Sequence, residues 1–127
     1  MKKRSFFTAL LLGAMLSSLL LIVAACGGSG AGDATVHLTN QNFAQSSVTV
    51  GKGHTLTLID DTATAHSISN GSWVNGNAQP AQEPGAPTVN AQFSGHDTHV
   101  VGPFNTAGTF HIFCNIHQGM NLTITVQ

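Results

Sequence analysis

Three residues with metal-binding side chains lie close together near the C-terminus. In the stretch FCNIHQGMN, Cys114, His117 and Met120 follow one another at intervals of three residues. Thiolate, imidazole and thioether together form a soft ligand set, and copper is the metal whose two oxidation states both accept it. Structural zinc prefers four strong ligands, and an iron–sulfur cluster needs several cysteines. The stretch therefore indicates most of a copper site.

A copper site of this kind needs a second histidine. His66 is the best candidate, because it stands where one strand-like run, LTLID, has ended and the next begins. The spacing of His96 and His99 would place them on opposite faces of a strand, and His111 should point away from Cys114 for the same reason. The remaining histidines, His37 and His54, have no potential ligand nearby.

The start of the chain has the layout of an export signal. A positively charged beginning, MKKR, precedes an apolar run that ends in small residues directly before Cys26. This pattern resembles the bacterial lipoprotein box, in which the cysteine becomes the lipidated first residue. An ordinary signal peptide and an uncleaved helix are the alternatives, but the Gly/Ser-rich continuation is typical of a flexible tether. We predict a lipoprotein signal peptide at 1–25, a tether at 26–33 and one domain at 34–127, exported and lipid-anchored at the outer face of a bacterial cell membrane or on the periplasmic side of a membrane.

Removal of the signal changes the sulfur and charge counts. If Cys26 carries lipid, Cys114 is the only thiol and Met120 the only methionine of the domain. An unpaired thiol in an oxidising compartment calls for an explanation, either metal ligation or inert burial. Lys52 remains as the single basic side chain against five acidic ones, which leaves a net charge of −4 with neutral histidines. So few basic residues argue against a nucleic-acid partner.

Short runs of alternating apolar and polar residues predict an all-β domain. The runs are ATVHLT, SVTV, HTLTLID, AHSIS, THVVG, TFHIFC and NLTITV, and Gly, Asn and Asp clusters separate them. Seven or eight strands in one small domain indicate an antiparallel sandwich or barrel, with Leu122, Ile124 and Val126 facing the core. The segment 70–92 lacks this periodicity, so we expect a packed excursion with Trp73 as a structural anchor.

Two long stretches resemble the cupredoxins, the family of plastocyanin, pseudoazurin, azurin and amicyanin. AGTFHIFCNIHQGMNLTITV is similar to their C-terminal ligand loop, with the short Cys-x2-His-x2-Met spacing found in amicyanin. FAQSSVTVGKGHTLTLIDDTATAHSIS resembles their N-terminal half. The resemblance implies an antiparallel eight-stranded Greek-key β-sandwich with one mononuclear type 1 copper at one end. It also implies the ligand set, with Met120 in the long axial position beside His66, Cys114 and His117.

Two residues depart from the family pattern. Ser67 stands where most members have an asparagine that braces the cysteine loop, a role that Asn115 could supply. Ile116 stands where amicyanin and plastocyanin have proline. Unlike proline, Ile116 has a backbone N–H, and its donation to the Cys114 sulfur would favour Cu(I). We therefore predict that Ile116→Pro lowers the reduction potential, which a redox titration without such a fall would contradict.

The function expected is a membrane-tethered one-electron carrier and not an enzyme, because four protein ligands leave no open position for a substrate. We expect electrons to leave through His117, inside an apolar patch with Ile116, Gly119 and Phe43, and Phe113 marks a second exit. Partners would be cytochromes or membrane-bound respiratory or electron-transfer complexes with a basic docking face, and we expect a monomer. The alternatives are a copper-binding module for storage, delivery or sensing, and a metal-free lipoprotein that binds a protein or glycan.

Overall fold

The computed structural model describes residues 31–127, which form nine strands. The expected signal peptide, the lipidated Cys26 and most of the tether lie outside the described residues. No helix in the described part is long and apolar enough to cross a membrane. The strands are β1 (Ala34–Leu38), β2 (Ser47–Val50), β3 (Leu56–Asp60), β4 (His66–Val74), β5 (Asn77–Pro80), β6 (Asn90–Phe93), β7 (Thr98–Val101), β8 (Gly108–Cys114) and β9 (Asn121–Val126).

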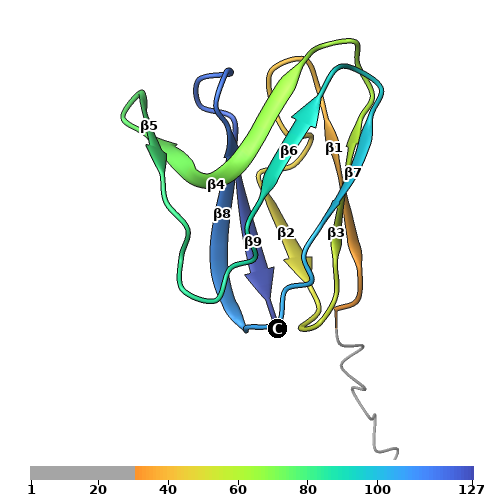
Figure 1. Ribbon diagram of the computed structural model, residues 1–127, viewed down its shortest axis with the longest axis vertical. Coiled ribbons are helices and arrows are strands. Elements are labelled where there is room, and N and C mark those ends of the chain that lie inside the picture. Colours follow the sequence, from red (N-terminus) through yellow and green to blue (C-terminus); the bar gives the residue numbers. More distant parts are fainter. Residues whose placement is uncertain (1–30) are drawn as a thin grey trace, which may run out of the picture.

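The strands form two sheets that face each other (Figure 1). One sheet has the order β1-β3-β7; the other has the order β2-β9-β8-β4-β5, with β6 also paired to β4. The predicted all-β sandwich is confirmed. Two pairs differ from the antiparallel expectation, since β1 runs parallel to β3 and β2 runs parallel to β9.

The strand count also differs from the expected eight, because the segment 70–92 is more regular than its sequence indicates. Strand β4 continues to Val74, and the chain then turns back into β5. The two strands pair antiparallel, with Gly71 opposite Pro80 and Val74 opposite Asn77. All residues of β5 are exposed, so no apolar alternation marks this strand in the sequence. The ninth strand, β5, therefore forms a surface hairpin with the end of β4.

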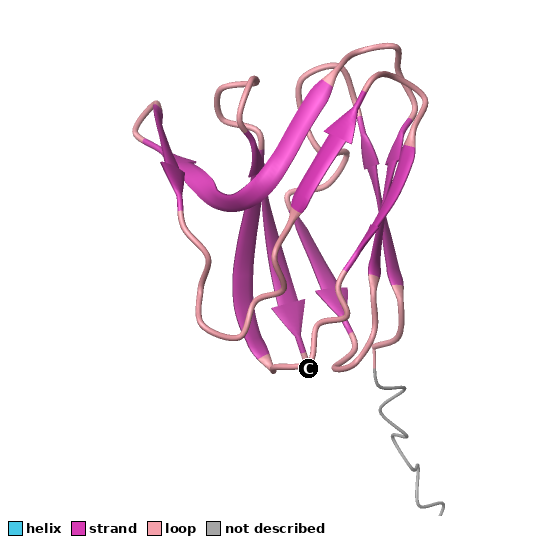
Figure 2. Cartoon of the chain, in the orientation of Figure 1, coloured by secondary structure: helices cyan, strands magenta, loops and turns pink. Residues whose placement is uncertain are grey.

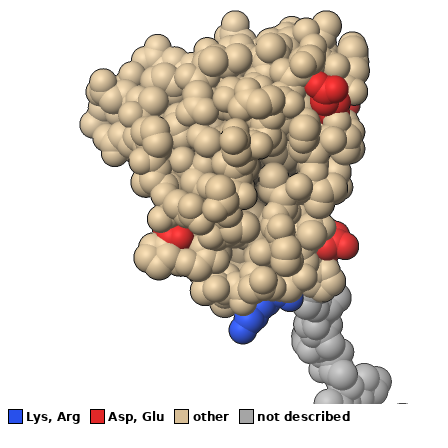
Figure 3. Space-filling view, viewed as in Figure 1, with Lys and Arg blue, Asp and Glu red and all other residues tan. Residues whose placement is uncertain are grey.

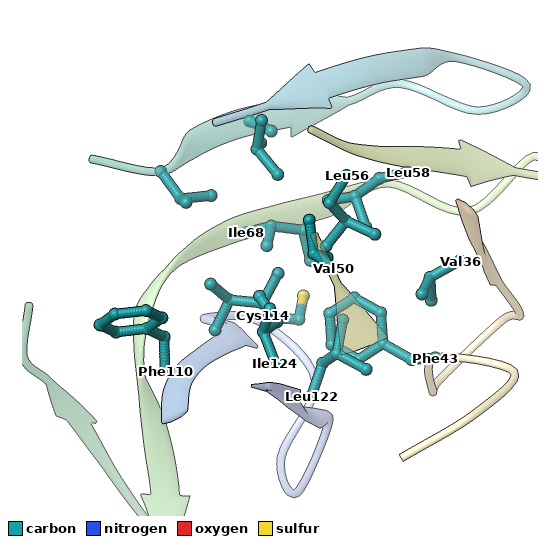
Figure 4. Packing of buried hydrophobic residues seen from close by; sticks show 14 of the residues in the cluster. Val36, Phe43, Val50, Leu56, Leu58, Ile68, Phe110, Cys114, Leu122 and Ile124 are labelled. Carbon is teal, nitrogen blue, oxygen red and sulfur yellow. The ribbon is translucent and has the colours of Figure 1, made fainter. Parts of the chain in front are cut away.

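The core lies between the sheets and includes the cysteine. Leu122, Ile124 and Val126 of β9 are buried, as predicted, and alternate with half-buried residues. Cys114 at the end of β8 is fully buried and belongs to the same hydrophobic cluster. Figure 4 shows its sulfur pointing into the interior near Ile124 and Leu122. The thiol is thus held on a packed sheet and not on a free loop.

Four loops gather at one end of the sandwich, drawn uppermost in Figures 1 and 2. They are the connections at 39–46, 61–65, 94–97 and 115–120. The start of β1 and the C-terminus lie at the opposite end. Because β8 ends and β4 begins at the upper end, the predicted ligands are brought to the same place.

Candidate metal centre

Three predicted ligands meet at the upper end of the sandwich. Ile68 in β4 lies opposite Cys114 in β8, which places His66, two residues earlier on the same face, beside the loop that follows the cysteine. The two imidazole Nδ1 atoms of His66 and His117 lie 3.1 Å apart. The Cys114 Sγ lies 3.9 Å from Nδ1 of His66 and 3.4 Å from Nδ1 of His117. Three donor atoms from two strands and a loop therefore face a common point.

These distances suit donors that share one metal ion. First-row metals such as zinc bind imidazole nitrogen and thiolate sulfur at roughly 2.0–2.3 Å, so donors around one ion should lie roughly 3–4 Å from one another. The three separations here fall within that range. Among the described residues, His66, Cys114 and His117 form the one such group of His, Cys, Asp or Glu side chains. The site accommodates a single ion.

Met120 stands at the end of the ligand loop and is fully buried. Two backbone hydrogen bonds close this loop: the Cys114 amide donates to the Met120 carbonyl at 3.0 Å, and the Met120 amide donates to the His117 carbonyl at 3.1 Å. Gly119 makes the turn with a φ of +81°, a conformation that glycine adopts without strain. The loop thus fixes the spacing of its three ligands through the backbone.

His66 is held in a buried, neutral state suited to metal binding. Its ring is 1% exposed. Burial lowers its pKa, and His117 acts in the same direction, while the charge of Asp60 and the Thr39 backbone oppose the shift. The neutral imidazole is the form that binds metals. The site therefore favours the metal-binding form of His66 before any ion arrives.

Asn115 provides the loop bracing that was expected where the family asparagine is replaced by Ser67. Its amide donates to the Ser67 carbonyl at 2.8 Å, and its side-chain nitrogen lies 3.3 Å from the Ser67 hydroxyl. Its side-chain oxygen accepts from Ser69 at 3.2 Å. Gln92 also donates to the Ser67 hydroxyl at 2.9 Å, a contact that the sequence did not indicate. The loop is tied to β4 at several points.

The far side of the Cys114 strand carries a second support, Trp73. Its Nε1 donates to the Cys114 carbonyl at 2.8 Å, and its ring packs edge-on against Phe113 with centroids 6.1 Å apart. Asn121 fixes the same residue through two hydrogen bonds, at 2.7 and 3.1 Å, to its backbone. The predicted anchoring role of Trp73 thus extends to a direct contact with a ligand residue.

The surroundings of three residues differ from the expectation: Ile116, Phe43 and Phe113. Ile116 is 58% exposed, and no hydrogen bond of ordinary geometry joins its amide to the Cys114 sulfur within the described chain, so that contact stays a prediction for the copper-loaded protein. Phe43 is only 7% exposed because it packs into the core, so its expected place in a surface patch was wrong. Phe113 faces away from the core but is fully buried beneath Trp73.

The other histidines stay outside the site. Three of them pair with carboxylates: His37 with Asp61 at 2.7 Å, His54 with Asp33 at 3.2 Å and His111 with Glu83 at 2.6 Å. The last pair confirms that His111 points away from Cys114. The ring of His99 packs on Phe93 with centroids 4.6 Å apart.

Comparison with known proteins identifies the family, although no family model matches the chain. The chain is 33% identical over 95 residues to a plastocyanin of Scenedesmus fuscus, covering 67% of this chain and 86% of that protein. This chain is a cupredoxin. Family membership assigns a single copper ion to the site and makes the protein a blue copper electron carrier.

Solved structures of cupredoxins share the fold. Amicyanin from Paracoccus versutus has a TM-score of 0.57 at 16% identity, covering 75% of this chain and 81% of that one. A purple cupredoxin from Nitrosopumilus maritimus has a TM-score of 0.58 at 19% identity, covering 75% of this chain and 100% of that one. These likenesses bear on the architecture alone.

Proposed function

We propose that His66, Cys114, His117 and Met120 hold the copper of this cupredoxin, which exchanges single electrons with other redox proteins. The convergence of the two Nδ1 atoms and the Cys114 Sγ carries this proposal. Copper bound there supplies one-electron chemistry between Cu(II) and Cu(I). Met120, buried at the end of the same loop, supplies the soft fourth donor that separates a copper site from structural zinc.

The protein's own contribution is rigidity. The ligands come from paired strands β4 and β8 and from a loop closed by backbone hydrogen bonds. Side chains locked by packing and outer hydrogen bonds hold a site within a narrow range of geometries. A small change in geometry between the two oxidation states favours fast electron exchange. With four protein donors no position stays open for a substrate, which supports a carrier and not an enzyme.

His117 is the proposed electron exit because it alone among the four ligands reaches the surface. His66, Cys114 and Met120 are at most 1% exposed, whereas His117 is half-buried. Ile116 and Gly119 stand exposed beside it. The proposed docking patch around His117 therefore consists of these two residues without Phe43.

Phe113 stays a second proposed exit, with one change. Because its ring has no exposed surface, a route through it continues into Trp73, which is half-buried. The hydrogen bond from Trp73 Nε1 to the Cys114 carbonyl gives this route a direct start at the ligand residue. The two proposed exits thus lie on different sides of the Cys114 strand.

The same proposal places the protein outside the cytoplasm on a lipid anchor at Cys26, as a monomer. The signal-like sequence at 1–25 and the Gly/Ser-rich stretch at 26–33 support it. About seven Gly/Ser-rich residues give a reach of roughly 15 Å. The start of β1 lies at the end away from the ligand loops (Figure 1), so such a tether leaves the copper end facing away from the membrane.

The charge of the domain supports a partner with a basic face, such as a cytochrome or a membrane-bound complex. Lys52 is the single Lys or Arg at 31–127, and Figure 3 shows one blue patch, at the end away from the ligand loops. Acidic side chains are scattered and few on the same view. A basic partner therefore meets no Lys or Arg of residues 31–127 that would repel it near the proposed exit.

Stopped-flow oxidation of the reduced domain by a basic cytochrome tests the carrier and its exit together. We expect rapid electron transfer that slows as salt screens the acidic domain. Ile116→Lys should slow it further by placing a positive charge beside His117. Val100→Lys is the matched control, because Val100 is 63% exposed on β7 in the other sheet. Equal rates for the two variants would contradict the His117 exit.

A further inference from the structure

Asp60 is a buried carboxylate without a matching cation. It is 2% exposed. Its Oδ1 accepts from the Thr62 amide at 2.9 Å and from the Thr62 hydroxyl at 2.8 Å, but its Oδ2 has no hydrogen-bond partner among the described residues. Burying a charge without a partner is costly, so such a group calls for a functional explanation.

The cations of the described chain lie elsewhere or pair with other carboxylates. Lys52 lies in the turn before β3, where its amide donates to the C-terminal Gln127, at the end away from the ligand loops. His37 pairs instead with Asp61, the exposed neighbour of Asp60. No cationic side chain of residues 31–127 forms an ion pair with Asp60. A cation bound near this carboxylate would supply the compensating positive charge.

Strand alternation points Asp60 toward the metal centre. In β3 the buried residues are Leu56, Leu58 and Asp60, so the carboxylate faces the interior at the upper end of the strand. In β4, on the facing sheet, His66 is the first of the buried residues at the same end. Figure 4 shows the inward side chains of β3 directed toward those of β4. Asp60 and His66 therefore face the same part of the interior.

The unpartnered atoms agree with this placement. Within the described chain, His66 Nε2 is the other buried atom at the ligand end that makes no hydrogen bond of ordinary geometry. Its Nδ1 belongs to the donor cluster, so Nε2 points to the opposite side of the ring, away from the ligand loop. The charge of Asp60 raises the pKa of His66 against the effect of burial, and the Thr39 backbone acts in the same direction.

We propose that Asp60 is the buried counter-charge of the copper site and that its charge favours Cu(II) over Cu(I). This rests on the proposed ligand set. A Cu(II) ion with one thiolate keeps a net positive charge, whereas a Cu(I) ion with one thiolate keeps none. An ionised carboxylate in a weakly screening interior therefore stabilises the oxidised site and disfavours the reduced one.

The decisive variant is Asp60→Asn, and Asp61→Asn is its matched control. Both remove one negative charge from adjacent positions, but the Asp61 side chain is 58% exposed and water screens it. At a fixed solution potential, Asp60→Asn should raise the ratio of Cu(I) to Cu(II) at least about tenfold, or 59 mV for a one-electron couple. Asp61→Asn should change it much less. Equal shifts in the two variants, or none in either, would overturn the proposal.

A second measurement avoids redox chemistry. Competition titrations with Co(II) and Ag(I) compare a divalent and a monovalent ion at the same donors. Asp60→Asn should weaken Co(II) binding several-fold more than Ag(I) binding, and Asp61→Asn should show no such difference. Equal weakening of both ions by Asp60→Asn would assign Asp60 a merely structural role and overturn the proposal.

Two controls keep the outcome interpretable. If Asp60→Asn does not fold, Asp60→Ser is neutral, keeps an acceptor for Thr62 and carries the same expectation. Failure of the ligand set itself is recognised separately, because the unaltered protein would then lack the type 1 copper spectrum. A normal spectrum with an unchanged potential in Asp60→Asn would overturn the role of Asp60 alone.

Discussion

Polar side chains at the two ends of the sandwich have opposite surroundings. Where the chain enters β1, the exposed Asp33 accepts from the Thr55 amide at 2.8 Å, the Thr55 hydroxyl at 3.1 Å and His54 at 3.2 Å. At the ligand end, His66 and Asp60 are buried, and each keeps an atom without a partner.

This difference separates a structural end from a functional one. Folding satisfies almost all buried polar groups, so the unpartnered atoms of His66 and Asp60 are candidates for an interaction that a bound ion supplies. The third such atom, Glu83 Oε2, belongs to a carboxylate that already pairs with His111. The Asp33 cluster closes a turn and needs nothing further. The donor atoms around His66 find a common partner only when an ion is bound. Until then, the unpartnered buried atoms at this end cost folding free energy.

Cys114→Ser should break the ligand end with the largest effect. A hydroxyl is a poor substitute for thiolate, so the intense visible absorption should vanish and Cu(II) affinity should fall by orders of magnitude. Titration with Cu(II), followed by absorbance, measures both. Asp33→Asn is the control at the other end and should leave the spectrum unchanged. Retention of the colour in Cys114→Ser would contradict the ligand assignment.

Met120→Leu should have a smaller effect at the same end. Leucine keeps the buried volume but has no lone pair for the metal, so the copper stays bound by the three strong ligands. Loss of the axial donor destabilises Cu(II) more than Cu(I) and should raise the ratio of Cu(I) to Cu(II) about tenfold at a fixed potential. Spectroelectrochemistry measures this ratio. A potential unchanged from the parent protein would remove Met120 from the ligand set.

Trp73→Phe tests the support behind the cysteine. It removes the hydrogen bond to the Cys114 carbonyl and part of the ring contact, and it should lower the free energy of unfolding by about 1–2 kcal/mol. Urea unfolding followed by circular dichroism is suitable, because Trp73 is the only tryptophan of the chain. Val74→Ala, at a neighbouring exposed position, should stay within about 0.5 kcal/mol of the parent. Equal losses in both variants would argue against a role for the hydrogen bond.

Acid should affect the two ends in different pH ranges. The pKa of His66 is lowered mainly by burial, so its contribution to the stability of the copper-free protein is full above the ordinary histidine value of 6.5 and is lost as the pH falls toward its lower folded pKa. The pKa of Asp33 is lowered mainly by the Thr55 amide, so its contribution is lost only below the ordinary aspartate value of 3.8.

Unfolding of the copper-free protein between pH 7 and pH 3 should therefore show two separate declines in stability. Asp33→Asn should remove the lower decline and leave the upper one. A single decline below pH 4 would contradict the buried state of His66.

The sequence predicted the ligands better than their surroundings. Cys114, His117 and Met120 lie within one short loop, so local spacing was enough to propose them, whereas His66 was proposed from its place after a strand and from the family resemblance. In the sequence, Asp60 and its neighbour Asp61 are typical of a polar turn. Only the alternation of buried and half-buried residues along β3 shows that Asp60 faces inward. The contact between Trp73 and Cys114 joins residues 41 positions apart, which local pattern cannot specify.

The fold shows the same limit. Most strands with one buried face were visible as alternating runs, including β9 with Leu122, Ile124 and Val126. Strand β6, which is only four residues long, was missed although Ala91 and Phe93 are buried. Strand β5 was missed because neither of its faces is buried. Phe43 was expected in the surface patch around His117, but tertiary packing buries its ring in the core.

The account rests on a type 1 copper site formed by His66, Cys114, His117 and Met120. Absorption and EPR spectra of the purified domain with one equivalent of Cu(II), taken before and after ascorbate, test this most directly. We predict an intense absorption toward the red and a small hyperfine splitting, with colour that disappears on reduction and returns on oxidation. An ordinary tetragonal Cu(II) spectrum would contradict the account and favour a copper-binding module without electron transfer.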